Sequence, residues 1–364
     1  FHVCKPGLPP CLGHDLFEGI VSVDLSLFIC NLVKVKKYFT YEQLNRSITQ
    51  FTYLGSDVNN KPCTVNVNGK KLGGHAVQNW CLLRLLPVIV GNRIKNPVED
   101  NVWQLCLKLR EIVELICASV ISTNQIAYLQ VLIEEYISDV CDIFPEYSLK
   151  PKHHFVLHYP WLISQFGPLI RLWTLRFESK HTFFKQCCRK LQNFKNVCKT
   201  LAHKHQLLQA YLGAGFLFPP TLIVEKSLPF AANACHEKIK TCISNCSFYS
   251  KEMDVHVAHR VTYKGTTYKK GMFVVLGRSE DELVVGQIEL ALIHMDSLYF
   301  VTQVHNAVRL IDLGVYDLVD NPGSDSDREF RCVAVEKLLD FYPLPMYSAF
   351  GCCLIPLHHA VVDE

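Results

Sequence analysis

A single carboxylate, Glu178, lies in the most basic stretch of this sequence. Residues 150–204 contain eleven Lys and Arg residues and no other Asp or Glu. Ordinary protein surfaces mix both signs of charge, so this imbalance indicates a polyanionic partner, of which nucleic acid is the commonest. A carboxylate at such a place would repel phosphate unless a divalent metal ion lay between them. Glu178 is therefore either a metal ligand of a site that cuts nucleic acid or a plain salt-bridge partner.

Two pairs of candidate zinc ligands bracket a long helical pattern. Cys11 and His14 form a C-x2-H pair, and His153 and His158 form an H-x4-H pair in which His154 could replace His153. One thiolate and three imidazoles make a four-ligand set that suits a structural zinc ion. The alternative is that these residues are a buried thiol and histidines with protein partners. The spacing alone leaves both interpretations open.

The sequence patterns of the segments that must position these residues predict an α+β fold. Apolar residues recur at helical spacing from Asp15 onward, with two helices, 98–122 and 124–143, expected to pair around Ser122-Thr123-Asn124. Trp103, Leu107, Ile112, Leu115 and Ile116 are the expected core of that pair. A long basic helix is expected over roughly 172–212. From about residue 249 the apolar period changes to two, which predicts short strands and a small β-barrel.

The expected organisation follows from these patterns. The segments are the end of a core segment with the C-x2-H pair (1–14), a helical insertion (15–150), a closing segment with the long basic helix (151–215), a linker (216–248), the β-barrel (249–320), and a loop and tail (321–364).

The composition excludes a disordered or disulfide-stapled chain. The 364 residues are 49% hydrophobic and 20% charged, with a net charge of +3, as in a globular protein of two or three domains. Several of the 17 Cys lie among apolar neighbours, which favours reduced thiols in the cytosol or nucleus. The apolar run 82–90 is too short to span a membrane and contains Arg84 and Pro87, so no membrane partner is expected. The sequence begins at Phe1 rather than Met, which predicts a fragment of a longer protein.

Two blocks of the sequence together resemble a known family. PPCLGHDLFEGI (9–20) contains the C-x2-H pair, and KPKHHFVLHYPWLISQFGPLIRLWTLRFESKHTFFK (150–185) contains the H-x4-H pair and Glu178. These blocks resemble parts of the CACTA (En/Spm-type) DNA transposases of animals, and the resemblance covers about residues 1–205. In that family a ribonuclease-H-like core is interrupted by a helical insertion, and the last acid of the DDE triad follows the insertion on a helix.

The resemblance implies roles for the residues named above. Glu178 matches the final catalytic acid, Cys11 and His14 match the first pair of zinc ligands, and His153 and His158 match the second. Zinc would be structural, and Mg²⁺ or Mn²⁺ would serve an active full-length enzyme, which needs three carboxylates to hold two metal ions. The family's two Asp residues lie upstream of the C-x2-H pair, where this chain has ten residues and no Asp. The chain as given is therefore expected not to cut DNA.

The expected function is DNA binding in the nucleus by the back part of a transposase-like protein. The expected phosphate contacts come from Arg171, Arg176, Lys180, Lys185, Arg189 and Lys190. One alternative is a domesticated, non-catalytic protein that binds a protein partner through the β-barrel. Another is a metal-dependent nuclease that uses Asp15 with Glu178. Against it, helix N-capping and surface exposure are expected to explain both Asp15 and Asp24. The sequence does not specify the oligomeric state.

Overall fold

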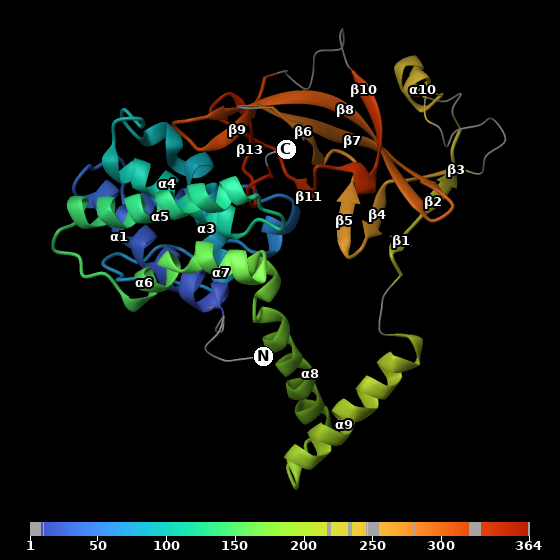
Figure 1. The fold of residues 1–364 in the computed structure, drawn as a ribbon, viewed down its shortest axis with the longest axis horizontal. Helices are drawn as coiled ribbons and strands as arrows, with labels where there is room; N and C mark the ends of the chain where they lie inside the picture. The colour runs from blue at the N-terminus through green and yellow to red at the C-terminus, as the bar shows by residue number, and fades with distance from the viewer. Residues whose placement is uncertain are drawn as a thin grey trace.

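The computed structural model is an α+β protein, with 48% of its residues in helices and 22% in strands. It describes residues 9, 11–216, 220–231, 235–244, 246, 255–279, 282–319 and 329–362. Helices fill one side of the molecule, the main sheet lies beside them, and a pair of helices projects away from both (Figure 1).

The helical module follows the pattern expected for residues 15–150. Ser122 caps α5 through a reciprocal pair of hydrogen bonds with Gln125, and the Asp100 side chain accepts hydrogen bonds from the first backbone N–H groups of α4. The five core residues expected for this helix pair are all buried. The elements are η1 (Leu12–Val21), α1 (Ser22–Lys34), α2 (Tyr41–Gln50), η2 (Gly55–Asn59), α3 (Ala76–Val90), η3 (Gly91–Arg93), α4 (Asn101–Ile116), α5 (Thr123–Ile143), α6 (Pro151–Leu157), α7 (Tyr159–Phe166) and η4 (Leu169–Leu172).

One helix is longer and more apolar than the sequence pattern indicated. The π-helical turns of η1 continue into α1, so that Leu12–Lys34 forms a helix of 23 residues with a mean hydropathy of 1.8 over its most apolar window. By length and composition this helix passes the test for a membrane span. However, 67% of that window is buried inside the fold, as is usual for the central helix of a helical core.

The expected long basic helix is divided into two. It comprises α8 (Leu175–Leu191) and α9 (Val197–Tyr211), which is followed by η5 (Leu212–Phe216). Gln192 and Asn196 both have left-handed backbones, with φ of 50° and 54°, and the chain reverses between them. Asn adopts the left-handed conformation more readily than most residues. The helix can therefore end here, although apolar residues continue at helical spacing beyond this point. We call residues 175–211 the basic hairpin.

Two long strands organise the main antiparallel sheet. β7 (Glu282–His294) and β8 (Ser297–Leu310) pair along their whole length, around a turn at Met295. Each also pairs with two shorter strands along its other edge. The remaining elements are β1 (Leu222–Val224), β2 (Ser227–Pro229), α10 (Glu237–Ser244), β3 (Val255–Ala258), β4 (Arg260–Tyr263), β5 (Thr266–Lys269), β6 (Phe273–Arg278), β9 (Val315–Leu318), β10 (Phe330–Ala334), η7 (Val335–Lys337), β11 (Asp340–Leu344), β12 (Tyr347–Ala349) and β13 (Cys352–Ile355).

The strands do not form the expected barrel. Among the described residues, β1, β4 and β5 make a small sheet and the other strands make a ten-stranded one, and neither closes on itself. Strands also lie in the stretches expected to be linker (216–248) and tail (321–364). A period of two identifies strands, but it carries no information on whether the outer strands of a sheet meet.

The sheet and the helical module share one core. Val315, Tyr347 and Leu354 of the sheet, and Leu313 in the turn between β8 and β9, belong to the same buried cluster as the helices. The Trp103 indole donates a hydrogen bond to the Asp312 carbonyl oxygen at 2.7 Å. The two parts are therefore joined by packing and do not stand as separate modules.

Candidate nucleic-acid interface and histidine cluster

The short helix α6 presents its histidines to different surroundings. His153 is 2% exposed, and its Nε2 atom lies 2.9 Å from Oδ2 of Asp24. Its Nδ1 atom lies 3.0 Å from the backbone nitrogen of Lys150. The consistent tautomer donates from Nε2 to the carboxylate and accepts at Nδ1. Both ring nitrogens of this expected zinc ligand therefore already have protein partners.

Asp24 is the centre of a buried polar network. It is fully buried, and it accepts hydrogen bonds from the hydroxyls of Tyr136 at 2.7 Å and Tyr147 at 2.9 Å, besides that from His153. Burial and the nearby carboxylate raise the pKa of both tyrosines well above the usual range. The expectation that surface exposure explains Asp24 was wrong. This carboxylate links α1, α5 and α6 inside the helical module.

His154, the alternative to His153, lies against His158. Their Nε2 atoms are 3.2 Å apart, and their rings are perpendicular at 89°. Both side chains are exposed. The signal in the sequence was the spacing of four residues, which places two side chains on one face of a helix, whereas a spacing of five does not.

Cys11 and His14 lie near α6 without completing a metal site. The Cys11 Sγ atom is 2.7 Å from Oγ1 of Thr174, and the His14 Nδ1 atom is 3.1 Å from Oε2 of Glu18. Lys152, which the sequence analysis missed, donates from Nζ to the backbone carbonyl of His14. Burial acts to raise the pKa of Cys11, but hydrogen bonds from Thr174 and from backbone groups outweigh it and lower that pKa.

The expected zinc set does not fit the structure as it stands. Within the described residues, no three His, Cys, Asp or Glu side chains are grouped so as to hold a metal ion. The His154–His158 pair supplies two ring nitrogens, and the other expected ligands are engaged elsewhere.

The start of α8 is held against the C-x2-H block. Trp173 stacks on Phe17 with ring centroids 5.3 Å apart. A Cβ atom on Gly13 would lie 2.7 Å from the Trp173 Nε1 atom, so the glycine permits this close approach. Asp15 was expected to be an N-cap, but it lies inside the first turn of η1, whose N-cap residue is Cys11. Its Oδ2 atom accepts a hydrogen bond from the Cys11 backbone nitrogen at 3.1 Å. Glu178 follows in the first turn of α8.

The expected phosphate-binding residues fall into three groups. Lys180, Lys185, Arg189 and Lys190 are exposed on the projecting helix α8. Arg171 lies at the base of the basic hairpin, where it donates a hydrogen bond to the Ser119 carbonyl oxygen at 2.9 Å. The side chains of residues 175–178, which include Arg176 and Glu178, lie outside the described residues.

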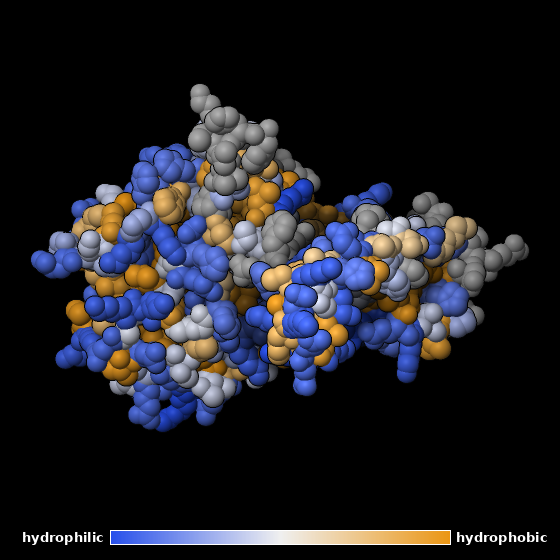
Figure 2. Space-filling view, turned by 90° about the horizontal axis from the view of Figure 1, so that it is seen from below, coloured by the Kyte–Doolittle hydropathy of each residue, from blue (hydrophilic) through white to orange (hydrophobic). Residues whose placement is uncertain are grey.

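The basic hairpin is separate from the core of the molecule. None of its described residues is buried, and α8 and α9 contact each other as they project from the body (Figure 1). The view from below shows hydrophilic residues over much of the molecule, with hydrophobic ones between them (Figure 2). In the described part of the chain, Lys185, Arg189, Lys190 and Lys195 form no ion pair. Their charge is therefore available to a partner.

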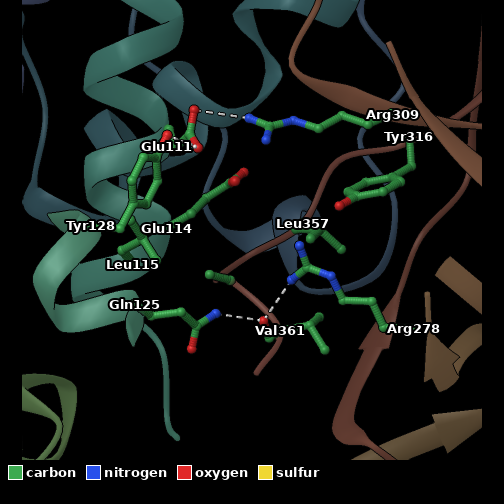
Figure 3. A pocket seen from close by; sticks show the side chains of 11 residues that line it. Glu111, Glu114, Leu115, Gln125, Tyr128, Arg278, Arg309, Tyr316, Leu357 and Val361 are labelled. Carbon is green, nitrogen blue, oxygen red and sulfur yellow. Dashed lines mark hydrogen bonds and ion pairs between the residues drawn. The ribbon is translucent and has the colours of Figure 1, made fainter. Parts of the chain in front are cut away.

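A small polar cavity lies where the sheet meets the helical module. Its volume is about 90 Å³, and Glu114 points into it beside Arg278 and Tyr316 (Figure 3). Glu111 and Arg309 form an ion pair at 3.0 Å at its wall. Burial raises the pKa of Glu114, and the Coulombic attraction of Arg110 opposes that rise. Ligand pockets usually exceed about 300 Å³, so this cavity has room for water but not for a nucleotide.

Comparisons with protein-family models, with curated proteins and with solved structures give no match to this chain.

Proposed function

We propose that this chain binds DNA in the nucleus through the basic hairpin, as the back part of a DDE-transposase-like protein. The single observation that supports the proposal is a projecting pair of helices (Figure 1) on which Lys185, Arg189, Lys190 and Lys195 form no ion pair with any described residue. Residues 175–211 contain eight Lys and Arg residues and one acidic residue, Glu178. The exposed cations reach outward from the body, where the backbone of a duplex can approach them without clashing with the core.

The contacts are to phosphates and do not read sequence. Lys and Arg side chains on an exposed helix neutralise backbone charge and release counterions, so affinity falls steeply with salt. Glu178 is the final acid of a metal site in this proposal, and the chain alone does not cut DNA. Asp15 accepts a hydrogen bond from the Cys11 backbone nitrogen and Asp24 is buried among three donors, so neither is a free carboxylate.

The test is a charge-removal variant of the hairpin. Lys185→Gln, Arg189→Gln and Lys190→Gln are combined, and the matched control combines Lys61→Gln, Lys70→Gln and Lys71→Gln in an exposed loop of the helical module. Binding to a blunt duplex is measured by fluorescence anisotropy from 50 to 300 mM salt. The hairpin variant should lower the slope of log affinity against log salt by about 3, since each phosphate contact contributes about 0.9.

The control variant should leave that slope unchanged. Equal losses in both variants would mean that net charge, not the hairpin, governs binding. Absence of salt-dependent duplex binding by the unaltered chain would overturn the proposal. Nicking of DNA with Mg²⁺ or Mn²⁺ that is lost in Glu178→Gln would contradict the statement that the chain alone does not cut.

A further inference from the structure

An open groove lies at the outer end of the basic hairpin. It has a volume of about 800 Å³, and it is lined by residues of α8 and of the turn that follows. Its lining includes His181, Phe184, Lys185, Arg189, Gln192 and Phe194. Two aromatic rings and two permanent cations therefore line one hollow.

The two phenylalanines of the groove differ in how they are held. Phe184 is half-buried, and its ring packs at 5.5 Å from Phe183 and at 5.7 Å from the His205 ring of α9. Phe194 is 68% exposed and sits in the reversal between the two helices. Neighbouring rings therefore hold the Phe184 ring in place, while Phe194 presents an aromatic face that no other part of the described protein covers.

The turn that carries Phe194 has a defined geometry. The Asn193 Oδ1 atom accepts a hydrogen bond from the Lys195 backbone nitrogen at 3.0 Å, and Gln192 and Asn196 are both left-handed. These features hold Phe194 at the outer end of the hairpin. An exposed aromatic ring between cations is the arrangement by which proteins stack unpaired bases while binding the adjoining phosphates.

We infer that this groove binds an unpaired nucleobase, in a single strand or at a frayed or overhanging end of a duplex. The inference rests on the proposed nucleic-acid binding by the basic hairpin and adds the kind of substrate. The bases inside a duplex are stacked on one another, so they cannot offer a ring face to Phe194. Lys185 and Arg189 at the groove complement the phosphates that flank an unpaired base.

The experiment compares four probes on the unaltered full chain at constant salt. These are a blunt DNA duplex, the same duplex with a three-nucleotide 3′ overhang, the same overhang with abasic sites, and a single-stranded RNA of equal length. The overhang should bind more tightly than both the blunt duplex and the abasic overhang. The RNA probe shows whether the groove binds an unpaired base of RNA as well as one of DNA, or binds only DNA.

The variants are Phe194→Ala and Phe194→Leu, with Phe341→Ala, an exposed residue of β11, as the matched control. Both Phe194 variants should lose roughly 5- to 100-fold in affinity for the overhang, because stacking on one aromatic side chain is worth that much per base. Both should bind the blunt duplex within about twofold of the unaltered chain. Phe194 is exposed, and a circular dichroism spectrum checks that the helices are retained.

Three results would overturn the inference. They are equal binding of the normal and abasic overhangs, an equal loss on the blunt duplex, and tighter binding of an acidic aromatic peptide that also depends on Phe194. If the blunt duplex binds with a steep salt dependence but no overhang preference appears, the groove assignment fails and the proposed function stands. If neither duplex nor overhang binds, both fail.

Discussion

The Nε2 atom of His153 lies 2.9 Å from Oδ2 of Asp24, although the two residues are 129 positions apart in the sequence. Neither side chain is more than 2% exposed. A buried charged group stabilises a fold only while its partners are in place, and removal of one partner leaves the other uncompensated. This pair therefore ties α1 to α6 inside the helical module.

The first prediction concerns the stability that depends on Asp24. Asp24→Asn should lower the free energy of unfolding by about 3 kcal/mol, because three buried donors then face a neutral amide in place of a carboxylate. Urea unfolding followed by circular dichroism measures the change. Asp142→Asn on the exposed side of α5 is the control and should change it by less than about 0.5 kcal/mol. Similar effects of the two changes would mean that the network contributes little.

The second prediction separates His153 from His154 as a metal ligand. Any Zn²⁺ that the chain binds through this pair should be held at least tenfold more weakly in His154→Ala and in His158→Ala, while the unfolding free energy stays nearly unchanged, because both rings are exposed and face each other. His153→Ala should instead lower stability. Zinc affinity is measured by competition with a fluorescent chelator. Loss of zinc binding in a folded His153→Ala variant, with retention in His154→Ala, would reverse the assignment.

The third prediction tests the joint between the sheet and the helical module. Tyr347 donates to Oδ2 of Asp57 at 2.8 Å and accepts from the Leu54 backbone nitrogen at 3.2 Å, and the Asp57 carboxylate also pairs with the buried Arg84. Tyr347→Phe leaves the buried Asp57 carboxylate and the Leu54 backbone N–H without this partner, so it should lower the unfolding free energy by about 1–3 kcal/mol.

The same substitution elsewhere in the sheet provides the control for Tyr347. Tyr263 donates to Glu336 near the surface, at 2.6 Å, so Tyr263→Phe should change the unfolding free energy by less than about 1 kcal/mol. Helical and strand signals should disappear in one transition in both variants, because the two parts share a core. Separate transitions for helices and strands would contradict the shared core.

The fourth prediction follows from buried thiols. Burial raises the pKa of Cys81 and of Cys106 to about 12, from 9.0 for an exposed thiol. Because the folded pKa is the higher one, the associated stability is complete below pH 9 and is lost as the pH rises from 9 to 12. Each thiol should contribute a slope of about 1.4 kcal/mol per pH unit in that window.

The measurement for the thiols is urea unfolding under reducing conditions at pH 7.5, 9.0, 10.0 and 11.0. Cys106→Ala should be less stable at every pH, because it leaves a cavity, but its stability should fall less steeply above pH 9. Cys63→Ala, at an exposed position, should keep the original slope. Parallel curves for all three proteins would rule out the buried thiols as the cause.

Local sequence patterns predicted the helical module well and its polar interior poorly. Capping residues and apolar spacing act over one or two turns, so Ser122 and the buried Trp103 could be placed from the sequence. Asp24 could not, because its partners Tyr136 and Tyr147 lie more than a hundred residues away. A carboxylate near a helix start resembles a surface cap until those partners are known.

Local sequence patterns also could not predict how the strands are arranged. The alternation from about residue 249 predicted strands, but it predicted short ones, whereas β7 and β8 are 13 and 14 residues long. The pairing of Leu354 with Asp317 of β9, and the packing of Tyr347 on the helices, depend on contacts between distant segments. The division of the long basic helix was also missed, because Gln192 carries no strong signal for a left-handed backbone.

The shared core also sets an order for events on the ribosome. The surface of the helical module that Tyr347 and Leu354 cover is complete once α5 has been made. About 200 further residues must be added before Tyr347 exists, which takes roughly 10–40 s at ordinary rates of synthesis. For that interval a nascent chain exposes apolar helix surface that the finished protein buries. Apolar surface left open in this way promotes aggregation, and chaperones exist to protect it.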